Sequence, residues 1–216
     1  MANSKNELAY DKIKDLFNSG AIKPGDKFSA YELSKQLGIS RTPITSALKR
    51  LEHEKLVEIL PQIGCTLRYP NGQESREHFL IRAVLEGFAA EMATINATDQ
   101  DINELNSILL RSEAAHVSKD EYASLNKAFH VKIVELSRMP HLIELINQFW
   151  ETPGYYGISI DFVSGRQDIS MQEHKEILEA IQKRDSMGVR VLVENHLRKC
   201  TDEFCANLND YTGSIT

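Results

Sequence analysis

The sequence predicts a mainly α-helical protein in two parts: an N-terminal helix-turn-helix domain with a small two-stranded hairpin, and a C-terminal all-α antiparallel helical bundle. Three observations lead to this prediction. Residues 33–51 have the pattern of two short helices joined by a tight turn, two strand-like runs follow them, and the remaining sequence shows helical periodicity without a convincing alternating strand. We expect the first domain at residues 1–69, a linker at 70–75 and the second domain at 76–216.

Length and composition exclude several classes of protein. The chain has 216 residues, of which 42% are hydrophobic, an ordinary value for a globular protein with a core. No apolar run is long enough to cross a bilayer, and the N-terminus lacks the apolar segment of a secretory signal. We therefore expect a cytoplasmic protein with no membrane partner. Three cysteines at no zinc-finger spacing predict reduced thiols without a function, namely Cys65, Cys200 and Cys205.

Charge is unevenly divided along the chain. The formal net charge is −6, yet residues 1–70 hold 11 Lys and Arg against 8 Asp and Glu, while residues 71–216 hold 14 against 23. A mildly basic head on an acidic body fits a DNA-reading domain joined to a domain with another task. A random distribution of surface charge is the alternative explanation.

The first 60 residues contain the signals of three helices. The apolar residues from Leu8 onward predict a helix of about three turns that stops at Gly20, with Leu8, Ile13, Leu16 and Phe17 near one face. After a turn at KPGDK, the next short helix ends at Gly38. Ser40 is a candidate cap for the third helix, and Pro43 falls in its first turn, where a missing N–H costs little.

The third of these helices has one apolar and one polar face. The apolar residues Ile44, Ala47, Leu48 and Leu51 recur at i, i+3, i+4 and i+7 and predict the buried side. The other face can hydrogen-bond to phosphates or base edges, through Arg41, Thr42, Thr45, Ser46, Lys49, Arg50 and His53. Two strands at 56–60 and 65–69, around a turn at Pro61 to Gly64, complete a winged helix-turn-helix.

Residues 8–69 resemble the GntR family of winged-helix bacterial transcription regulators. The resemblance lies in the run KPGDKFSAYELSKQLGISRTPITSALKRLEHEKLV and in the wing turn QIG. It implies DNA contacts from the start of the recognition helix and from the wing tip, at Arg41, Thr42, Thr45, Lys49 and Gly64. To these, the polar face of the helix adds Ser46 and Arg50.

One departure from the family concerns the recognition helix. The family usually has arginine and glutamate where this chain has Thr45 and Ser46. A short hydroxyl cannot make the bidentate guanine contact of an arginine, so we expect a different operator. A winged helix that binds protein instead of DNA is the alternative, which the many phosphate-type donors disfavour.

The second half of the chain reads as six helices. They are predicted at residues 74–96, 98–116, 119–136, 141–150, 170–183 and 186–209, with Asp99, Asp101 and Asp120 in first turns, where a helix favours negative charge. Residues 151–169 contain Pro153, Gly154, Gly157 and Gly165 and are expected to be irregular and to border a pocket.

Three histidines are predicted to face the interior of this bundle. His130 precedes Ile133 and Val134 by three and four residues, and His174 and His196 have similar apolar neighbours one turn away. A buried imidazole needs a partner, and a shared metal ion would satisfy all three rings. Asn126, one turn before His130, is a candidate fourth ligand. Hydrogen-bonded core histidines without a metal are the more common alternative.

The order LNKAFH, EHKEILEAIQKRD and ENHL is similar to the FCD ligand-sensing domain of the FadR-type branch of GntR regulators, over roughly residues 74–204. The resemblance implies a divalent metal ion, zinc or nickel, held by an aspartate and three histidines. Here the aspartate position is Asn126. Because asparagine is a neutral, weaker ligand, affinity for the metal is expected to fall, while the ion keeps its full charge and attracts anions more strongly.

An anionic effector follows from this charge. We expect a small carboxylate metabolite to complete the coordination shell, with Arg82 and Arg166 as charged partners. The alternative for Arg82 is an exposed i, i+4 pair with Glu86 that contributes little, and for Arg166 it is a solvated loop side chain.

Three functions are compatible with these features. The first is a metabolite-responsive repressor or activator that binds a near-palindromic operator as a homodimer. The second is a regulator without a metal ion, whose helical bundle binds a larger apolar acid near Phe129, Trp150, Tyr155 and Tyr156. The third, a metal-dependent hydrolase, is disfavoured because there is no HExxH motif, and because Glu173 and Glu194 are poorly placed as bases for His174 and His196. We therefore expect no enzyme.

Overall fold

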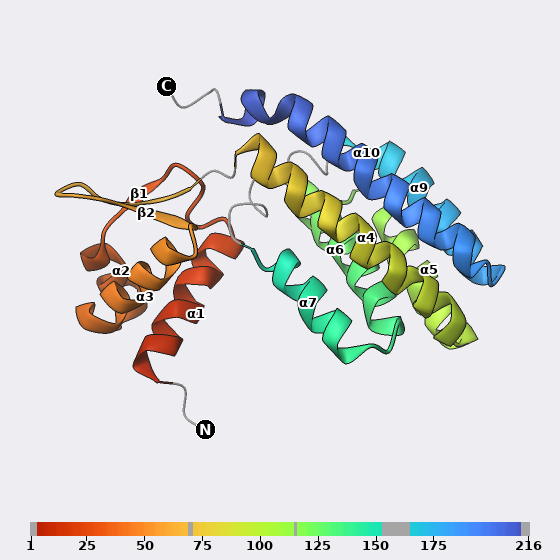
Figure 1. Ribbon diagram of the computed structural model, residues 1–216, viewed down its shortest axis with the longest axis horizontal. Helices are drawn as coiled ribbons and strands as arrows, with labels where there is room; N and C mark the ends of the chain where they lie inside the picture. The colour runs from red at the N-terminus through yellow and green to blue at the C-terminus, as the bar shows by residue number, and fades with distance from the viewer. Residues whose placement is uncertain (1–3, 69–70, 115, 153–164, 213–216) are drawn as a thin grey trace. The chain divides into compact units, whose positions relative to one another are not determined.

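The protein folds into two compact units, the first built on Met1–Pro70 and the second on Asn71–Trp150 and Ser159–Tyr211. The computed structural model describes residues 4–68, 71–114, 116–152 and 165–212, with side chains as far as residue 206 in the last helix. The predicted fold class, a winged helix-turn-helix domain followed by a helical domain, is confirmed (Figure 1). None of the described helices is long and apolar enough to span a membrane.

The first unit consists of three helices and a small sheet: α1 (Lys5–Asn18), β1 (Lys27–Phe28), α2 (Ala30–Leu37), α3 (Arg41–His53), β2 (Val57–Leu60) and β3 (Gly64–Leu67). The sheet is antiparallel, with strand order β1-β3-β2. The sequence predicted a two-stranded wing and missed β1, because a strand of two residues has no periodicity to detect. Leu8, predicted on the buried face of α1, is instead 42% exposed.

Local capping signals set the ends of α2 and α3. Ser29 and Glu32 form a reciprocal capping box at the start of α2, and Gly38 ends that helix in the left-handed conformation with φ of 66°. Ser40 is the N-cap residue of α3, but its side chain makes no capping hydrogen bond. The turn between the two helices therefore depends on Gly38 rather than on a cap from Ser40.

The second unit is all helical in its described parts: α4 (Gly72–Asn96), α5 (Asp99–Ser112), α6 (Lys119–Leu136), α7 (Pro140–Trp150), α9 (Gln167–Gln182) and α10 (Ser186–Thr212). Two predicted irregular stretches are partly helical. Helix α4 begins inside the predicted linker, and α9 begins three residues before the predicted start, so Gln167 to Ile169 are helical. Most of the predicted pocket border, residues 153–164, lies outside the described residues.

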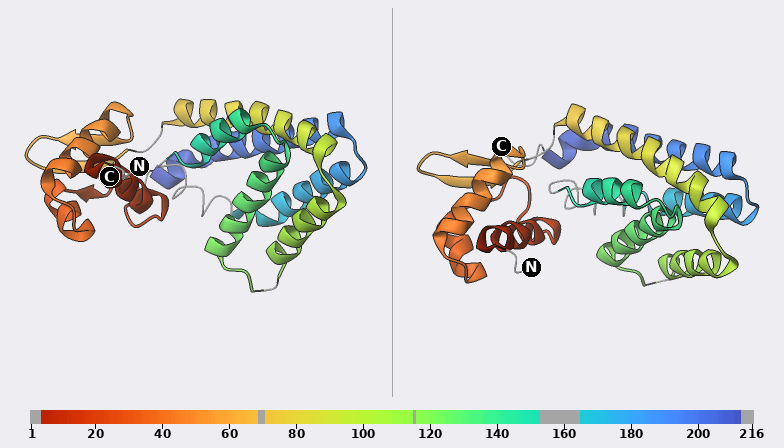
Figure 2. Two further views of the ribbon diagram at one scale, coloured as in Figure 1. Left: turned by 90° about the horizontal axis from the view of Figure 1, so that it is seen from below. Right: turned by 60° about the horizontal axis from the view of Figure 1, so that its bottom comes forward.

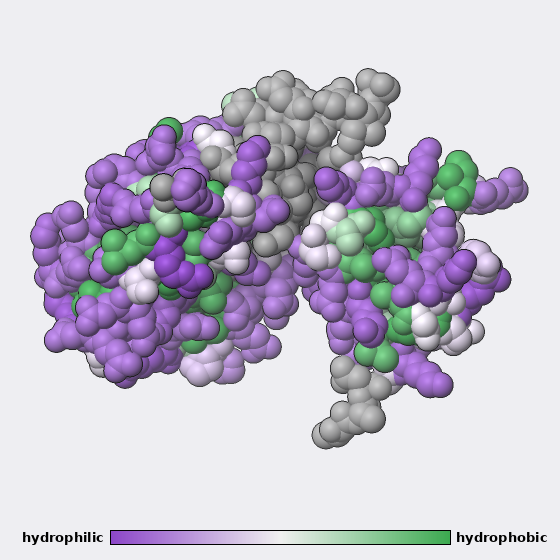
Figure 3. All heavy atoms as spheres, turned by 180° about the vertical axis from the view of Figure 1, so that it is seen from behind, coloured by the Kyte–Doolittle hydropathy of each residue, from purple (hydrophilic) through white to green (hydrophobic). Residues whose placement is uncertain are grey.

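Side chains from five helices of this unit form its main core. The largest cluster joins residues of α4, α5, α6, α9 and α10, including Leu105, Tyr122, Ile177 and Val193. Helices α4 and α10 approach each other closely at Gly87, where an added Cβ would lie 2.6 Å from Cγ of Glu194, and Figure 2 shows the two helices side by side. The face seen in Figure 3 is mostly hydrophilic, with apolar side chains visible among the hydrophilic ones. The histidines lie within this packed interior.

Candidate DNA-binding surface and metal centre

Helix α3 separates its apolar and polar residues as predicted. Pro43, Ile44, Ala47, Leu48 and Leu51 are all buried against the core of the first unit. The polar side chains are all exposed, at Arg41, Thr42, Thr45, Ser46, Lys49, Arg50 and His53. Apolar burial therefore fixes the helix and leaves a row of donors facing solvent.

Two arginines on this face have different surroundings. The guanidinium of Arg50 pairs with Glu54 at 3.0 Å and Glu7 at 3.2 Å and lies 3.8 Å from the ring centroid of Tyr10. Arg41, at the start of the helix, instead lies with its guanidinium 5.0 Å from the ring centroid of the exposed Tyr31. Arg50 is thus held within the first unit by two carboxylates, whereas the guanidinium of Arg41 lies beside an aromatic ring.

The backbone conformation at position 64 requires a glycine. The φ of Gly64 is 134°, a conformation that L side chains rarely adopt. A Cβ at this position would lie 2.6 Å from the carbonyl oxygen of Phe28 in β1. The glycine predicted to contact DNA is therefore also required for the close approach of β3 to β1.

The three histidines predicted to face inward do meet inside the second unit. His130 on α6, His174 on α9 and His196 on α10 are all buried, and their candidate ligand atoms lie within 4.8 Å of one another. Their ring centroids are 4.8 to 5.2 Å apart. Such a set of imidazole nitrogens is suited to a divalent transition metal ion.

His130 is held by a buried carboxylate from another helix. Its Nδ1 lies 2.9 Å from Oε2 of Glu86 on α4, and Nε of Arg82 donates to Oε1 of the same carboxylate at 2.8 Å. Burial alone would raise the pKa of Glu86, but the Arg82 guanidinium and the hydrogen bond from His130 outweigh burial and hold this pKa at about 2. The ionised carboxylate therefore accepts a hydrogen bond from Nδ1–H of His130, so Nε2 is the ring nitrogen that remains for a metal ion.

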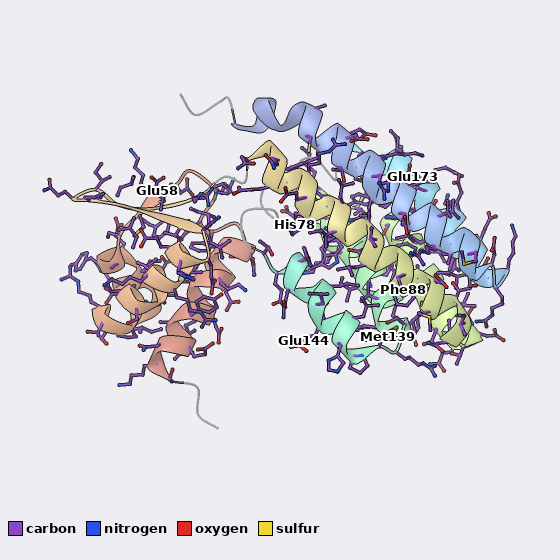
Figure 4. The ribbon with its side chains drawn as sticks, in the orientation of Figure 1. Glu58, His78, Phe88, Met139, Glu144 and Glu173 are labelled. Atoms are coloured by element: carbon purple, nitrogen blue, oxygen red, sulfur yellow. The ribbon has the colours of Figure 1, made fainter. Side chains whose placement is uncertain are left out.

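His196 has an equivalent arrangement with Glu173. Its Nδ1 lies 2.7 Å from Oε2 of Glu173 on α9, which is labelled in Figure 4. The carboxylate also accepts hydrogen bonds from Arg166 and Lys199 at 3.0 Å. These donors and His196 lower the pKa of Glu173 to about 2 against the opposing effect of burial. Burial lowers the pKa of His196 to about 4 despite the carboxylate, so the ring is neutral at pH 7.

His174 lacks such a partner. It is 1% exposed, and within the part of the chain that the structure describes its Nε2 has no hydrogen-bond partner. Burial, with the nearby His196 and His130, lowers its pKa well below the ordinary value. A neutral, buried nitrogen that nothing in the described chain satisfies is the observation that best fits a bound metal ion.

Asn126 is half-buried on α6, one turn before His130. Its position on the same helix is that predicted for a fourth ligand. Cys200, one turn after His196, has its sulfur 3.9 Å from Nε2 of that ring, and burial raises the pKa of the thiol to about 12. The thiol is therefore protonated at neutral pH.

The two arginines predicted to bind an effector are both buried in ion pairs. The i, i+4 pair of Arg82 with Glu86 exists, but the two residues are 5% and 2% exposed, so the alternative of an exposed, weak pair is wrong. Arg166 is not a solvated loop residue either, because it is buried at the N-cap of α9 and bonds Ser170, Glu173 and Glu203. Each arginine is linked through a carboxylate to one of the histidines.

The aromatic residues named for an apolar pocket have separate surroundings. Phe129 is buried with its ring centroid 4.6 Å from that of His174, and the ring centroid of Trp150 lies 3.6 Å from the Arg82 guanidinium. Tyr155 and Tyr156 lie outside the described residues.

Sequence reasoning missed the carboxylate partners of the histidines. Glu86 was considered only as a surface partner of Arg82, and Glu173 only as a possible base. A signal for Glu86 was present, because it falls on the apolar stripe of α4 with Phe79, Ala83, Ala90 and Ala93. An acid on a buried stripe requires a cationic or N–H partner.

Comparison with protein families divides the chain in the same way. Residues 5–67 match the model described as bacterial regulatory proteins, gntR family, and residues 77–199 match the FCD domain. The second match alone spans more than half of the chain.

Several curated proteins are similar over most of their length. The Nta operon transcriptional regulator of Aminobacter aminovorans is 31% identical over 196 residues, covering 90% of each chain, and the transcriptional regulator McbR of Escherichia coli is 30% identical over 184 residues, covering 82% of each. The solved structure of E. coli McbR/YncC covers 97% of this chain and 99% of its own, with a TM-score of 0.75 at 24% identity. This structure supports the fold.

Proposed function

The chain belongs to the GntR family of bacterial regulatory proteins, carries an FCD domain and is a DNA-binding transcriptional regulator. From this premise we propose that its affinity for DNA is controlled by a small carboxylate, bound at or near a divalent metal ion in the second unit. The buried Nε2 of His174, which has no partner and lies beside two other imidazoles, carries this proposal.

DNA recognition is assigned to the exposed start of α3 and the wing. Arg41, Thr42, Thr45, Ser46 and Lys49 supply donors for phosphates and base edges, and Gly64 permits the close strand approach from which the wing extends. Arg50 was expected to contact DNA, but its ion pair with Glu7 and its contact with the Tyr10 ring, both on α1, favour a role in holding α3 against α1.

Binding as a homodimer would provide specificity. One recognition helix reads only a few base pairs, so two copies on a near-palindromic operator, with half-sites about one helical turn apart, double the contacts. The mildly basic first part of the chain, with 11 Lys and Arg in residues 1–70, supports attraction to the phosphate backbone.

The metal site would be formed by His130, His174 and His196, with Asn126 as a fourth ligand. Glu86 and Glu173 fix the Nδ1–H tautomers of two rings, which directs their Nε2 lone pairs to the shared space. Arg82 and Arg166 hold these carboxylates in place. Zinc or nickel suits imidazole ligands, and a bound ion supplies positive charge for an anionic effector.

Metal analysis of protein purified without a chelator or an affinity tag tests the site. We expect about one zinc or nickel ion per chain in the wild type and a clear loss in His130→Ala, His174→Ala and His196→Ala. His141→Ala, which changes an exposed histidine of α7, is the matched control and should retain the metal. Unchanged metal content in all three cluster variants would show that the site is wrong.

Two alternatives predict different results. A regulator with a metal-free pocket would bind carboxylic acids equally well with and without a chelator. A hydrolase would turn over an ester panel, but the named relatives are transcriptional regulators, and the two carboxylates nearest the rings are engaged by His130 and His196.

A further inference from the structure

A second unsatisfied group lies beside the histidine cluster. The indole Nε1 of Trp150, at the end of α7, is buried and has no hydrogen-bond partner among the described residues. The ring of Trp150 is 5.7 Å from the ring of His130, measured between centroids, and His174 lies 5.2 Å from His130. Trp150 Nε1 and His174 Nε2, both without a partner among the described residues, therefore belong to rings that lie near the ring of His130.

A metal ion can satisfy only one of them. The Nε2 lone pair of His174 can bind a cation, but an indole N–H is only a donor and requires an acceptor oxygen. A buried donor without an acceptor destabilises the folded state, because its hydrogen bond to water is lost and not replaced. Loading the three histidines with metal would thus leave Trp150 unsatisfied, and a ligand oxygen or a water molecule must supply the acceptor.

The charges around the indole favour an anionic acceptor. The Arg82 guanidinium lies 3.6 Å from the centroid of the Trp150 ring, and Nζ of Lys127 lies 6.0 Å from it. Glu86 offsets the charge of Arg82 but is already bonded to Arg82 and His130. A divalent ion on neutral ligands would add further positive charge beside these side chains.

We propose that Trp150 is an effector-binding residue whose indole N–H donates a hydrogen bond to an oxygen of the carboxylate that binds at the metal. This inference rests on the proposed function and assigns the recognition of the acid to Trp150, in place of the two arginines already paired with carboxylates. Arg82 acts through the indole, because the stacked guanidinium holds the ring in position.

Calorimetric titration of the zinc-loaded full-length protein with acetate, lactate, malate and citrate tests the proposal. At least one acid should bind the wild type. Trp150→Phe keeps an aromatic ring over Arg82 but removes the N–H, so it should weaken that acid ten- to a hundredfold, the range for a hydrogen bond to a charged group, while zinc content and the melting temperature stay unchanged. The matched control is Phe149→Leu on the same helix, which should bind the acid as the wild type does.

The wild type provides an independent readout. Trp150 is the single tryptophan of the chain, so its fluorescence should change when the acid binds zinc-loaded protein. Two results would overturn the role of Trp150 and leave the proposed function standing: equal acid affinity in Trp150→Phe with zinc retained, or unchanged fluorescence at saturating acid. Both are expected if a water molecule accepts the hydrogen bond. Loss of zinc in Trp150→Phe also overturns this role. If none of the four acids binds, both this inference and the proposed carboxylate response fail.

Discussion

The two units hold their functional side chains in opposite surroundings. On α3, donors such as Arg41 and Lys49 are exposed and need no partner from the protein. In the second unit, the three histidines are buried, and two of them depend on carboxylates from other helices, Glu86 and Glu173. A surface that binds DNA can thus be built from one helix, whereas a buried sensing site needs a network of charges that must be satisfied when the chain folds.

The largest effect expected from this difference is on folding of the second unit. Glu86→Ala leaves the buried Arg82 guanidinium without its carboxylate, so the free energy of unfolding should fall by about 3–5 kcal/mol. Urea unfolding followed by the fluorescence of Trp150 measures this, because the single tryptophan lies in the second unit. Glu77→Ala, at an exposed position of the same helix, should change the value by less than about 0.5 kcal/mol. Similar losses in both variants would contradict the buried network.

Mild acid should destabilise the metal-free second unit through its buried histidines. Unfolded histidines bind protons near their ordinary pKa of 6.5, whereas burial lowers the folded pKa of His196 to about 4 and of His78 to about 3. The unfolded state therefore binds more protons below pH 6.5, and His78 and His196 should each lower the free energy of unfolding by roughly 2 kcal/mol between pH 7 and 5.

The same urea assay, repeated at pH 7, 6 and 5 after chelation, checks this sign. The first unit has one histidine, the exposed His53, so the hydrogen-exchange protection factors of its core amides, corrected for the pH dependence of intrinsic exchange, should change little over this range. A second unit whose stability is constant from pH 7 to 5 would show that its histidines are not buried in the neutral form.

Two glycine substitutions test how tightly the backbone of the first unit is packed. Gly64→Ala places a Cβ 2.6 Å from the backbone oxygen of Phe28 at a φ of 134°, and it should destabilise the wing by about 2 kcal/mol or more. Gly20→Ala also has a positive φ but meets no atom within 4 Å, and should cost about 1 kcal/mol. Hydrogen exchange of the β1 and β3 amides measures the difference, and equal effects would exclude the close approach as the cause.

The smallest effect concerns the two arginines of α3. Arg41→Ala should weaken binding to an operator selected from random duplexes by roughly five- to thirtyfold, equivalent to 1–2 kcal/mol. Arg50→Ala, which removes an arginine already paired with Glu7 and Glu54, should weaken it less. Fluorescence anisotropy at a fixed salt concentration measures both dissociation constants. A larger loss of affinity for Arg50→Ala than for Arg41→Ala would contradict the assignment of the main DNA contact to Arg41.

The parts predictable from sequence were those set by local periodicity. The buried stripe from Ile44 to Leu51 and the inward direction of His130, His174 and His196 follow from helical spacing alone, and both are confirmed. The pairing of Glu86 with His130 spans 44 residues and joins two helices. Periodicity places each residue on a face of its own helix but says nothing about which helix faces it.

Other features depended on tertiary contacts. Strand β1 has only two residues and exists because it pairs with β3. The i, i+4 spacing of Arg82 and Glu86 is the same whether the pair is exposed or buried, so the sequence could not distinguish a solvated pair from the buried one observed. The missing partner of Trp150 Nε1 is equally invisible without the packing of α7 near α6.

Operator affinity measured with and without a bound acid tests the central claim most directly. For the zinc-loaded wild type, an acid identified by calorimetry should change the dissociation constant of the selected operator by roughly five- to a hundredfold, the usual range of coupling between two sites. The change should disappear after chelation and in His174→Ala, while the affinity of the acid-free protein for DNA is retained. An equal response to the acid in zinc-loaded, chelated and His174→Ala protein would contradict control through the buried metal site.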